Sequence, residues 1–527
     1  MATDLKIAIR KIVSVNPATG AVLRELECAE ENDVHAAVTR AREAQAAWAE
    51  IGVRERIAVL REFQRKLQEK KSEIAEAITR EAGKPVAEAL TTEVLVVLDA
   101  ARFLIGNAYR LLRDEPLPHG GLATKLKSGR LVREPYGVVG IISPWNYPFS
   151  IPATETLAAL VAGNAVVLKP SEFTSLVALE LRSLLHAAGV PQDVFQVVVG
   201  DGATGAALIH SRGETAIDKL VFTGSVATGK RIAAAVAERL LPVVLELGGK
   251  DPMLVLDDAD VDVASSAAVW GAFVNAGQTC LSVERCYVHR SLYESFLKAC
   301  VEKTNKLRVG HGLDRDTDVG PMIHERQLRI VESHVEDAVA CGARVLAGGS
   351  RLPEMGTNFY KPTVLADVTH EMHIMREETF GPVLPVMAFD SDEEAVRLAN
   401  DSGYGLAASV WTRNRDRGDR LARRIQAGTI MVNDVVSCFG ISEAPHGGVK
   451  SSGVGRTHGR FGLDEMVRLK YVDVDLMPGM KKVWWYGYGM SFLRQMEGFL
   501  DMQFARDLVT RLRGALRAIG VVGRKQL

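Results

Sequence analysis

One cysteine of the sequence stands where a thiol could react. Cys280 ends the segment Gly277-Gln278-Thr279-Cys280, and a cysteine that follows such a turn has backbone N–H groups around it. These donors can stabilise a thiolate and an oxyanion that develops beside it. A lone cysteine is also commonly a small buried residue. The segment alone therefore leaves two interpretations open, a nucleophile and a core residue.

A glutamate at the end of an apolar strand is the second candidate. Glu246 is followed by Leu247, two glycines and Lys250. A carboxyl group in an apolar strand is costly unless it is neutralised or needed for chemistry, such as that of a general base. The two glycines allow another backbone to approach closely. Pairing of Glu246 with Lys250 is the structural alternative.

An asparagine in a rigid loop is the third candidate. Asn146 lies between Pro144 and Pro148, directly after an apolar run. A side-chain amide held in this way is a suitable donor to an oxyanion. Asparagine is also common in turns because its side chain bonds to nearby backbone. The loop therefore allows a catalytic or a purely structural role.

Two glycine patterns could bind phosphate groups. Gly200–Gly205 matches G-x-G-x-x-G after a strand, but the acidic residue expected about 20 positions later is not at a strand end. Phe222–Gly229, with the sequence FTGSVATG, opens a helix, and Ser225 with the first N–H groups of that helix could hold a pyrophosphate. We favour the second pattern and interpret the first as a tight turn.

The elements that must position these residues form two α/β series. The first third of the chain has helical periodicity, interrupted at Gly83-Lys84-Pro85, and strands alternate with helices from Gly137 onward. Alternation of this kind predicts parallel, doubly wound sheets. A second series starts near Pro252 and includes a helix over Val261–Ala276. We expect two α/β domains that meet between about residues 247 and 252.

Taken together, seven motifs resemble the NAD(P)-dependent aldehyde dehydrogenase superfamily. They are PWN, LKPSE, FTGS, ELGGK, GQTC, EETFGPV and GGVKSSGVGR, in this order. The resemblance runs from about Asn16 to about Val474, and the 34-residue spacing between Glu246 and Cys280 fits the family. It implies an aldehyde dehydrogenase-like α/β fold of two doubly wound domains, with a small oligomerisation arm and, here, a helical C-terminal extension.

The resemblance also implies roles for individual residues. Cys280 corresponds to the nucleophile, Glu246 to the general base, and Asn146 to the side-chain half of an oxyanion hole completed by the Cys280 N–H. Lys169 and Glu172 correspond to residues that bind the adenosine ribose. The full set of cofactor contacts implied in this way is Trp145, Lys169, Glu172, Gly224, Ser225, Glu378 and Phe380.

The implied reaction is the NAD-dependent oxidation of an aldehyde to a carboxylic acid. It passes through a cysteine thiohemiacetal and a thioester, which water activated by Glu246 then hydrolyses. A carboxylate at Glu172 accepts from a ribose 2′-hydroxyl and repels a 2′-phosphate, which favours NAD over NADP. Two alternatives remain: a dehydrogenase that transfers the acyl group to coenzyme A, and a non-catalytic NAD-binding protein.

Two positions depart from the family pattern. The residue before the Gly447-Gly448 pair is often Phe in the family and is His446 here. A glutamate that some members place after the SG-x-G-R stretch corresponds to Arg460, so a proton-relay role is not carried over. The residues that line the substrate tunnel vary too much to identify the aldehyde.

The predicted domain organisation follows from these patterns. Residues 1–116 and 137–247 form the NAD-binding domain, and 248–447 the catalytic domain. Segments 117–136 and 468–477 have strand-like patterns that resemble the family's oligomerisation arm, so we expect a homodimer or tetramer. Residues 478–527 form an amphipathic, basic C-terminal extension.

The C-terminal extension has two interpretations. Residues 478–527 contain nine Lys and Arg against three Asp and Glu, with apolar residues at helical spacing and a Trp- and Tyr-rich start. Most amphipathic helices pack on a protein surface, here the enzyme's own body or another subunit. A basic, aromatic helix also suits peripheral contact with a membrane.

Composition limits the remaining functions. The chain has 527 residues and a net charge of -1, so nucleic acid is not expected as a partner. Six cysteines without a C-x-x-C pair are typical of a reduced, cytoplasmic protein, and we find no secretory signal or apolar run that could span a membrane. His370 and His373 are three residues apart, but no other ligand cluster is near, so no metal is expected.

Overall fold

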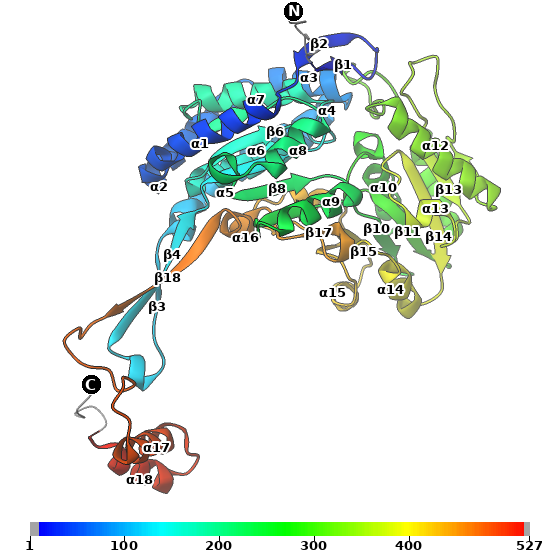
Figure 1. Ribbon diagram of the computed structural model, residues 1–527. Helices are drawn as coiled ribbons and strands as arrows, with labels where there is room; N and C mark the ends of the chain where they lie inside the picture. The colour runs from blue at the N-terminus through cyan, green and yellow to red at the C-terminus, as the bar shows by residue number, and fades with distance from the viewer. Residues whose placement is uncertain (1–9, 521–527) are drawn as a thin grey trace, which may run out of the picture. The chain divides into compact units, whose positions relative to one another are not determined.

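The computed structural model describes residues 10–520 of the chain (Figure 1). The chain forms two compact units, Met1–Arg113 with Arg133–Arg468 and Asp114–Val132 with Leu469–Leu527. The larger unit contains two α/β domains with parallel-rich sheets, which confirms the fold class expected from the sequence. The domain boundaries predicted above remain a prediction.

The first sheet of the larger unit has six strands within the described residues, in the order β17-β9-β8-β5-β6-β7. Edge strand β17 is antiparallel to β9, and the other neighbours are parallel. The strands are β5 (Val138–Ile142), β6 (Ala165–Lys169), β7 (Phe195–Val197), β8 (Lys219–Thr223), β9 (Val243–Glu246) and β17 (Gly453–Val454). Every residue of β5 and β6 is buried, which explains their uninterrupted apolar sequence.

Helices cover both faces of this sheet. The connecting helices are α6 (Ser150–Ala162), α7 (Ser175–Ala187), α8 (Gly202–His210) and α9 (Val226–Ala237). Right-handed crossovers place α6 and α7 on one face and α8 and α9 on the other. Helix α1 (Glu31–Glu50) packs on β6 and α8, while α2 (Val53–Glu69) and α5 (Leu95–Leu112) cover α6. The remaining elements of this domain are β1 (Lys11–Val15), β2 (Val22–Glu27), α3 (Lys71–Ala82), α4 (Val86–Glu88), the π-helical turn Ala89–Val94 and α16 (Gly459–Asp464).

The order of these strands creates a crevice. From β5 the chain runs first to β6 and β7 on one side and then crosses to β8 on the other side. Loops on opposite sides of such a switch point diverge, and ligands of open α/β sheets bind there, at the carboxyl ends of the strands. The loop with Asn146 follows β5, and Gly224 and Ser225 follow β8.

The second sheet has seven strands within residues 10–520, in the order β12-β13-β14-β11-β10-β15-β16. Only the pair of β12 and β13 is antiparallel. The strands are β10 (Asp251–Val255), β11 (Val283–His289), β12 (Arg344–Ala347), β13 (Thr363–Ala366), β14 (Val383–Phe389), β15 (Ala407–Trp411) and β16 (Thr429–Val432). The helices are α10 (Val261–Phe273), α11 (Tyr293–Thr304), α12 (Glu325–Ala340), α13 (His373–Arg376), α14 (Asp392–Asn400) and α15 (Arg415–Ala422).

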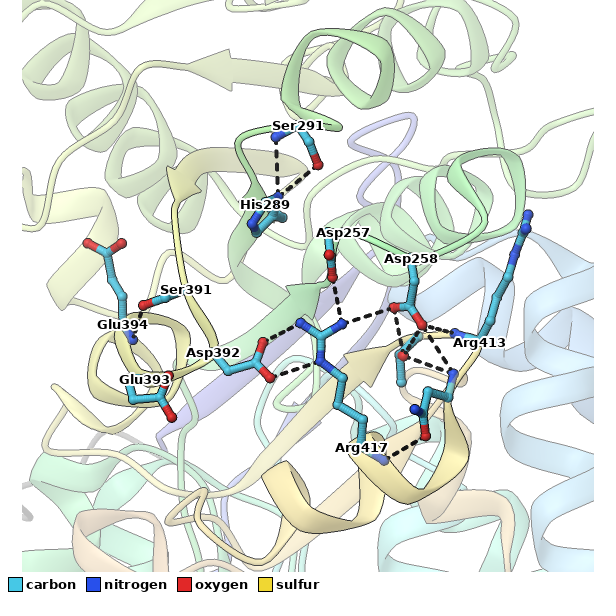
Figure 2. Close-up of polar contacts among 12 residues, drawn as sticks. Asp257, Asp258, His289, Ser291, Ser391, Asp392, Glu393, Glu394, Arg413 and Arg417 are labelled. Carbon is cyan, nitrogen blue, oxygen red and sulfur yellow. Dashed lines mark hydrogen bonds and ion pairs between the residues drawn. The ribbon is translucent and has the colours of Figure 1, made fainter.

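Side chains close the switch point of the second sheet (Figure 2). It lies at the carboxyl ends of β10 and β15, where Arg417 of α15 reaches three carboxylates. Arg417 binds Asp392 through two nitrogens at 2.8 and 2.6 Å and Asp257 at 2.6 Å, and it lies 3.6 Å from Asp258. The guanidinium holds the pKa of Asp257 below its usual range. This edge is therefore a satisfied ionic cluster.

The two domains meet across a cavity that is lined by loops at the strand ends of both sheets. Segments that follow β5, β6, β8 and β9 line the same cavity as segments that precede β11, β14 and β15. The carboxyl edge of the first sheet therefore faces the amino edge of the second. Any group bound in the cavity is reached by loops of both domains.

The smaller unit is described separately. Strands β3 (Glu115–Leu117), β4 (Lys127–Pro135) and β18 (Val467–Asp475) form a sheet in the order β18-β4-β3. Within it the His119 ring lies 2.6 Å from the Tyr471 hydroxyl, and Lys127 pairs with Asp473. Helices α17 (Met490–Phe504) and α18 (Leu508–Ala518) follow as a hairpin, so the predicted C-terminal extension is helical.

Candidate active site

Cys280 lies in a sharply folded loop before β11. The sequence predicts a helix as far as Ala276, and this is wrong, because α10 ends at Phe273. Asn275, Ala276 and Gly277 all have positive φ, of 55°, 55° and 71°. A Cβ on Gly277 would lie 2.1 Å from the backbone oxygen of Gly381, so only glycine fits there. The strained turn brings Cys280 to the border of two cavities.

Asn146 is fixed from both its ends. Its Nδ2 donates to the Gln278 backbone oxygen at 3.1 Å, and its own backbone oxygen accepts from Asn275 Nδ2 at 2.9 Å and from Lys84 Nζ at 2.8 Å. An amide nitrogen has two hydrogens, so one remains for a ligand. Asn146 and Cys280 line the same cavity, which brings these two predicted residues together.

Glu246 ends β9 and faces that cavity as well. It is buried, and neither carboxyl oxygen has a hydrogen-bond partner within the described part of the chain. Desolvation, and then the Glu155 carboxyl, raise the pKa of Glu246 well above its usual value. The alternative of pairing with Lys250 is excluded, since Lys250 binds Glu284. An orphaned carboxyl in a cavity wall is a group that awaits a substrate or a water.

One histidine, His446, adjoins Glu246, and a second, His458, lies beside His446. His446 Nε2 lies 3.7 Å from Glu246 Oε2, and the ring of Phe439 packs edge-on against both His446 and His458. Burial lowers the pKa of His446 to about 3 and that of His458 to about 4, so both rings are neutral. Arg460 does not reach the site; it lies on α16 at 3.4 Å from Asp464. Sequence reasoning singled out His446 but missed His458.

The cofactor candidates lie along a cavity of about 890 Å³. Lys169, at the end of β6, is buried with its Nζ 3.6 Å from Glu172 Oε2. Ser225 caps α9 by accepting from Thr228 N at 3.3 Å, so the N-terminus of that helix opens on the cavity. The other lining residues among the predicted contacts are Trp145, Gly224, Glu378 and Phe380. The cavity thus brings all seven together.

The first glycine pattern lines the cavity too. Gly202 and Gly205 are in the first turn of α8 and line the cavity, and Gly205 adjoins Lys169. A Cβ on Gly205 would lie 3.9 Å from Lys169 Cδ. The expectation that this pattern is only a tight turn is therefore incomplete, since both glycines border the space near the predicted ribose contacts.

Aromatic and acidic side chains form the far end of this cavity. The ring of Phe380 lies edge-on to Trp145 at 5.5 Å between centroids, and Trp145 contacts the His324 ring at 5.7 Å. Glu378 Oε1 accepts from Gly249 N at 3.0 Å, and burial raises the pKa of Glu378 to about 8. These groups provide a flat apolar surface beside a carboxyl group, as a ribose-linked ring requires.

Three buried glutamates hold the loops of the site, and sequence reasoning missed all three. Each accepts hydrogen bonds from two consecutive backbone N–H groups. Glu93 binds the N–H groups of 149 and 150, Glu284 those of 379 and 380, and Glu81 those of 176 and 177, at 2.8–3.1 Å. They are at most 5% exposed. The segments so held are the starts of α6 and α7 and the loop before β14, and they contain or adjoin the predicted contacts Asn146, Glu172 and Phe380.

Two of these glutamates are paired with buried lysines. Lys84 Nζ lies 2.7 Å from Glu93 Oε1, with both side chains fully buried, and Lys250 pairs with Glu284. Lys84 was interpreted from sequence only as part of a break between helices. A Lys between Gly and Pro gives no local signal of its partners, because these lie 9 and 62 residues further along the chain.

A smaller apolar cavity of about 240 Å³ also reaches Cys280. Its described lining includes no Lys, Arg, Asp or Glu. The residues are Thr91, Thr92, Val96, Tyr147, Ile151, Trp270, Thr279, Cys280, Leu281, Val436, Ser437, Phe439 and Gly440. Cys280 is thus the point at which a space suited to a large polar ligand meets a space suited to an apolar one.

The other cysteines and the histidine pair stay outside the site. Cys28, Cys286, Cys300 and Cys438 are buried, Cys341 is exposed, and none is in a disulfide. His370 is bound through its two nitrogens, to Tyr287 at 2.6 Å and to Asp401 at 3.1 Å. In residues 10–520, no group of three or more His, Cys, Asp or Glu side chains is placed to hold a metal ion.

Comparisons with known proteins give a consistent result. The profile described as "Aldehyde dehydrogenase family" matches residues 6–472. A 4,4'-diapolycopene aldehyde oxidase of Methylomonas sp is 41% identical over 501 residues, 94% of this chain and 92% of the relative. A putative succinate-semialdehyde dehydrogenase [NADP(+)] of Mycolicibacterium smegmatis is 40% identical and covers 86% of each chain. The crystal structure of an NAD-dependent aldehyde dehydrogenase from Sinorhizobium meliloti superimposes with a TM-score of 0.85 at 38% identity, over 89% of this chain and 92% of that one.

Proposed function

Because this chain belongs to the aldehyde dehydrogenase family, we propose that it oxidises an uncharged, apolar aldehyde to the carboxylic acid with NAD, through Cys280. One observation supports this most strongly: Cys280 lies where the larger cavity meets the apolar one. A nucleophile at such a junction can be reached by an aldehyde from one side and by a cofactor from the other.

The first step joins Cys280 to the aldehyde. Burial, and then the Asp251, Glu378 and Glu246 carboxyls, hold the pKa of the Cys280 thiol above its usual value, so the thiol must give its proton to a base. Glu246 is the base that lines the same cavity. The sulfur then attacks the carbonyl carbon, and the carbonyl oxygen takes the displaced electron pair. Asn146 Nδ2 and the Cys280 N–H donate to that oxygen, each contributing about 2.7–4 kcal/mol.

The cofactor site fits a dinucleotide. A Cβ on Gly224 would lie 2.6 Å from the Phe222 ring and one on Gly248 would lie 2.5 Å from the Glu378 carboxyl, so glycine at each place makes room for that side chain in the cavity wall. When bound, the nicotinamide group supplies the hydride acceptor. Lys169 and Glu172 would hold the adenosine ribose, Ser225 and the start of α9 the pyrophosphate, and Glu378 with Phe380 the nicotinamide ribose and ring.

The second half of the reaction releases the acid. Oxidation of the thiohemiacetal leaves an acyl thioester on Cys280. Glu246 first releases the thiol proton to solvent and so becomes a carboxylate again. It then takes a proton from water, the water oxygen attacks the thioester carbon, and the C–S bond breaks with its electrons returning to sulfur. The buried, raised-pKa carboxyl of Glu246 suits this role. Transfer of the acyl group to coenzyme A is the alternative, which acyl-CoA formation would reveal.

Two substitutions test the mechanism. Cys280→Ala should lower the rate of NADH formation by at least about a hundredfold, since the covalent nucleophile is lost, while NAD should still bind. Cys286→Ala, a buried cysteine outside both cavities, is the matched control and should keep full activity. Glu246→Gln should slow the burst of NADH, because the Cys280 thiol loses its base, and turnover should then stall because the thioester is not hydrolysed. Full steady-state turnover by Cys280→Ala or Glu246→Gln would refute the corresponding role.

NAD is the proposed cofactor because of Glu172. This half-exposed carboxylate borders the cavity beside Lys169, where a 2′-phosphate would meet a like charge. The relatives differ in their names, one NAD-dependent and one NADP. Michaelis constants measured with both cofactors test the preference. We expect a lower value for NAD, and a smaller difference between the two in Glu172→Gln.

The apolar substrate class follows from the smaller cavity. A carboxylate such as that of succinate semialdehyde would lose its hydration there without a cation to replace it, which is costly. The relative named for diapolycopene aldehyde fits this character better than those named for succinate semialdehyde. We expect kcat/KM for decanal to exceed that for succinate semialdehyde. The opposite order would refute the assignment.

Assembly and location remain proposals as well. The antiparallel sheet β3-β4-β18 exposes Leu117, Leu469 and Tyr471. Sheets of this kind pair or are covered, so we propose a homodimer or tetramer. Light scattering at micromolar concentration tests it, and a monomer would refute it. Free cysteines throughout the chain suit a reducing cytoplasm, which cell fractionation tests.

A further inference from the structure

The two C-terminal helices pack on each other through backbone. Only Gly498 of α17 and Gly514 of α18 are buried in the two helices. A Cβ on Gly498 would lie 2.7 Å from the Gly514 backbone oxygen, and a Cβ on Gly514 would lie 2.6 Å from the Gly498 backbone oxygen. The helices therefore cross closely at two glycines, and no core of side chains forms between them. We call α17 and α18 the C-terminal hairpin.

This crossing leaves the apolar side chains of the hairpin in solvent. Nine large ones are between 49% and 72% exposed: Met490, Leu493, Leu500, Phe504, Leu508, Val509, Leu512, Leu516 and Ile519. On α18, Leu508, Leu512, Leu516 and Ile519 recur at intervals of four, four and three, so they share one face of the helix. A contiguous apolar face of this kind marks an interaction site.

The charges of the hairpin identify the partner. Residues 478–520 contain seven Lys and Arg against three Asp and Glu, a net charge of +4. Two of the three acids are engaged within the hairpin, since Asp501 binds Arg517 and Asp507 caps α18. Arg494, Arg506 and Arg513 have no ion pair among the described residues and are exposed. The apolar face therefore has a cationic border, which matches an anionic surface.

Aromatic residues stand immediately before the hairpin. Trp484, Trp485, Tyr486 and Tyr488 are between 42% and 72% exposed. Indole and phenol side chains combine an apolar body with a polar tip, and they concentrate where apolar and aqueous phases meet. Four such rings beside a helix with an apolar face and a cationic border are more typical of a membrane interface than of a protein–protein interface.

The helices are suited to lie on a membrane and not to cross it. No described helix is long and apolar enough to span a membrane. The 15 and 11 residues of α17 and α18 would measure only about 22 and 16 Å, against about 30 Å for a hydrocarbon core. Two copies of the same cationic face would repel each other, which disfavours a second copy as the occupant.

We propose that the C-terminal hairpin binds the surface of an anionic lipid bilayer, with its apolar face in the acyl boundary and its arginines at the headgroups. This inference does not depend on the proposed function, because lipid binding is measured without substrate. Binding of the hairpin to a bilayer would bring the proposed active site to a surface in which apolar aldehydes dissolve.

Co-sedimentation of the full chain with vesicles tests the proposal. Wild-type protein should pellet with vesicles of phosphatidylcholine and phosphatidylglycerol, less so with phosphatidylcholine alone, and less so at high salt. Leu512→Asp/Leu516→Asp should lower partitioning by at least about tenfold, since two apolar contacts are lost. Arg506→Gln/Arg513→Gln should lower it by about fivefold for each charge removed.

The matched control changes charge elsewhere. Leu240 and Leu313 are exposed leucines of the larger unit, so Leu240→Asp/Leu313→Asp adds the same two charges and should pellet like wild type. Unchanged NADH formation from a short, water-soluble aldehyde shows that each variant is folded. Wild-type protein that stays in the supernatant with anionic vesicles would overturn the proposal. The proposal would also be overturned if the Leu512→Asp/Leu516→Asp variant pelleted like wild type. It would be overturned as well if wild-type protein self-associated without lipid in light scattering and this variant did not, because the apolar face would then bind a second copy.

Discussion

Replacement of Lys84 by methionine would remove a buried cation that orients the oxyanion loop. Lys84 Nζ donates to Glu93 at 2.7 Å and to the Asn146 backbone oxygen at 2.8 Å, and it lies 3.9 Å from the centre of the Tyr147 ring. Methionine keeps a similar length but has no charge and no donor. Lys84→Met therefore leaves Glu93 as an unpaired carboxyl and loosens the segment that presents Asn146.

The magnitude has two parts. Removal of one partner of a buried pair costs about 3–5 kcal/mol of stability, and both side chains here are fully buried. Loss of an oxyanion donor costs at most about 10²–10³ in kcat. The effect on kcat should stay below that limit, because Asn275 still donates to Asn146. We expect kcat to fall by about tenfold to a hundredfold.

A matched control separates stability from positioning. Lys219 is also buried, pairs with Glu465 at 2.6 Å and lies over an aromatic ring, that of Tyr136 at 4.9 Å. Lys219→Met should lower the thermal inactivation temperature as Lys84→Met does. Assayed where both variants are folded, only Lys84→Met should lose kcat. Equal kcat values in the two variants would refute the positioning argument.

Three further predictions concern other buried groups. Glu284→Gln weakens the bond to the Phe380 N–H, so the Michaelis constant for NAD should rise in steady-state assays while kcat at saturating NAD changes less. We expect kcat to rise with pH as Glu246 loses its proton. His446→Phe removes the polar neighbour of Glu246, so this rise should move to higher pH, and His446→Gln should move it less; an unchanged pH profile would contradict this. Burial raises the pKa of Glu155 from 4.5 to about 8, so its contribution to stability is complete below 4.5 and is lost as the pH rises through 8. Glu155→Gln should therefore gain thermal stability relative to wild type across that range, which a pH series of unfolding temperatures measures.

Much of the fold could be predicted because its signals are local. The buried strands Val138–Ile142 and Ala165–Lys169 are uninterrupted apolar runs, and the helices between them have helical periodicity. Asn146 and Glu246 stand at the ends of such runs and Cys280 ends a Gly-Gln-Thr turn, whereas the roles expected of all three come from the family resemblance of the seven motifs together. A polar residue just after a buried strand lies at the carboxyl end of that strand, and the carboxyl ends of the strands are where ligands bind in open α/β sheets.

The end of α10 could not be predicted, because its cause is distant. Ala and Val continue the helical pattern to Ala276, yet the backbone turns left-handed at Asn275. The Asn275 N–H is bound by Glu88 Oε2 at 3.0 Å, and its side chain donates to Asn146. Glu88 is 187 residues away in the sequence. Local propensity favours the helix, and tertiary hydrogen bonds overrule it.

The same reasoning explains why the glutamates that hold the site escaped notice. Glu81, Glu93 and Glu284 each lie in a helix or strand, where a single charged residue usually faces solvent. The role of each comes from two backbone N–H groups that lie 56 to 96 residues away, at the start of a helix or in a loop. Sequence patterns therefore identify the candidate reacting residues more easily than the buried residues that position them.

These buried acids are explained better by positioning than by stability. A buried ion pair often contributes no more stability than an apolar pair of the same volume, because both charges lose their hydration. A carboxylate, however, can accept from two successive N–H groups at once, and no apolar side chain can do so. Glu93 and Glu81 use this property at the starts of α6 and α7, and Glu284 uses it on the loop before β14. These segments adjoin the proposed oxyanion donor, the proposed ribose contact and the proposed nicotinamide contact. Each of these three segments thus depends on one buried acid. Any other arrangement would leave that acid without its two hydrogen bonds, which favours a single arrangement of the segment.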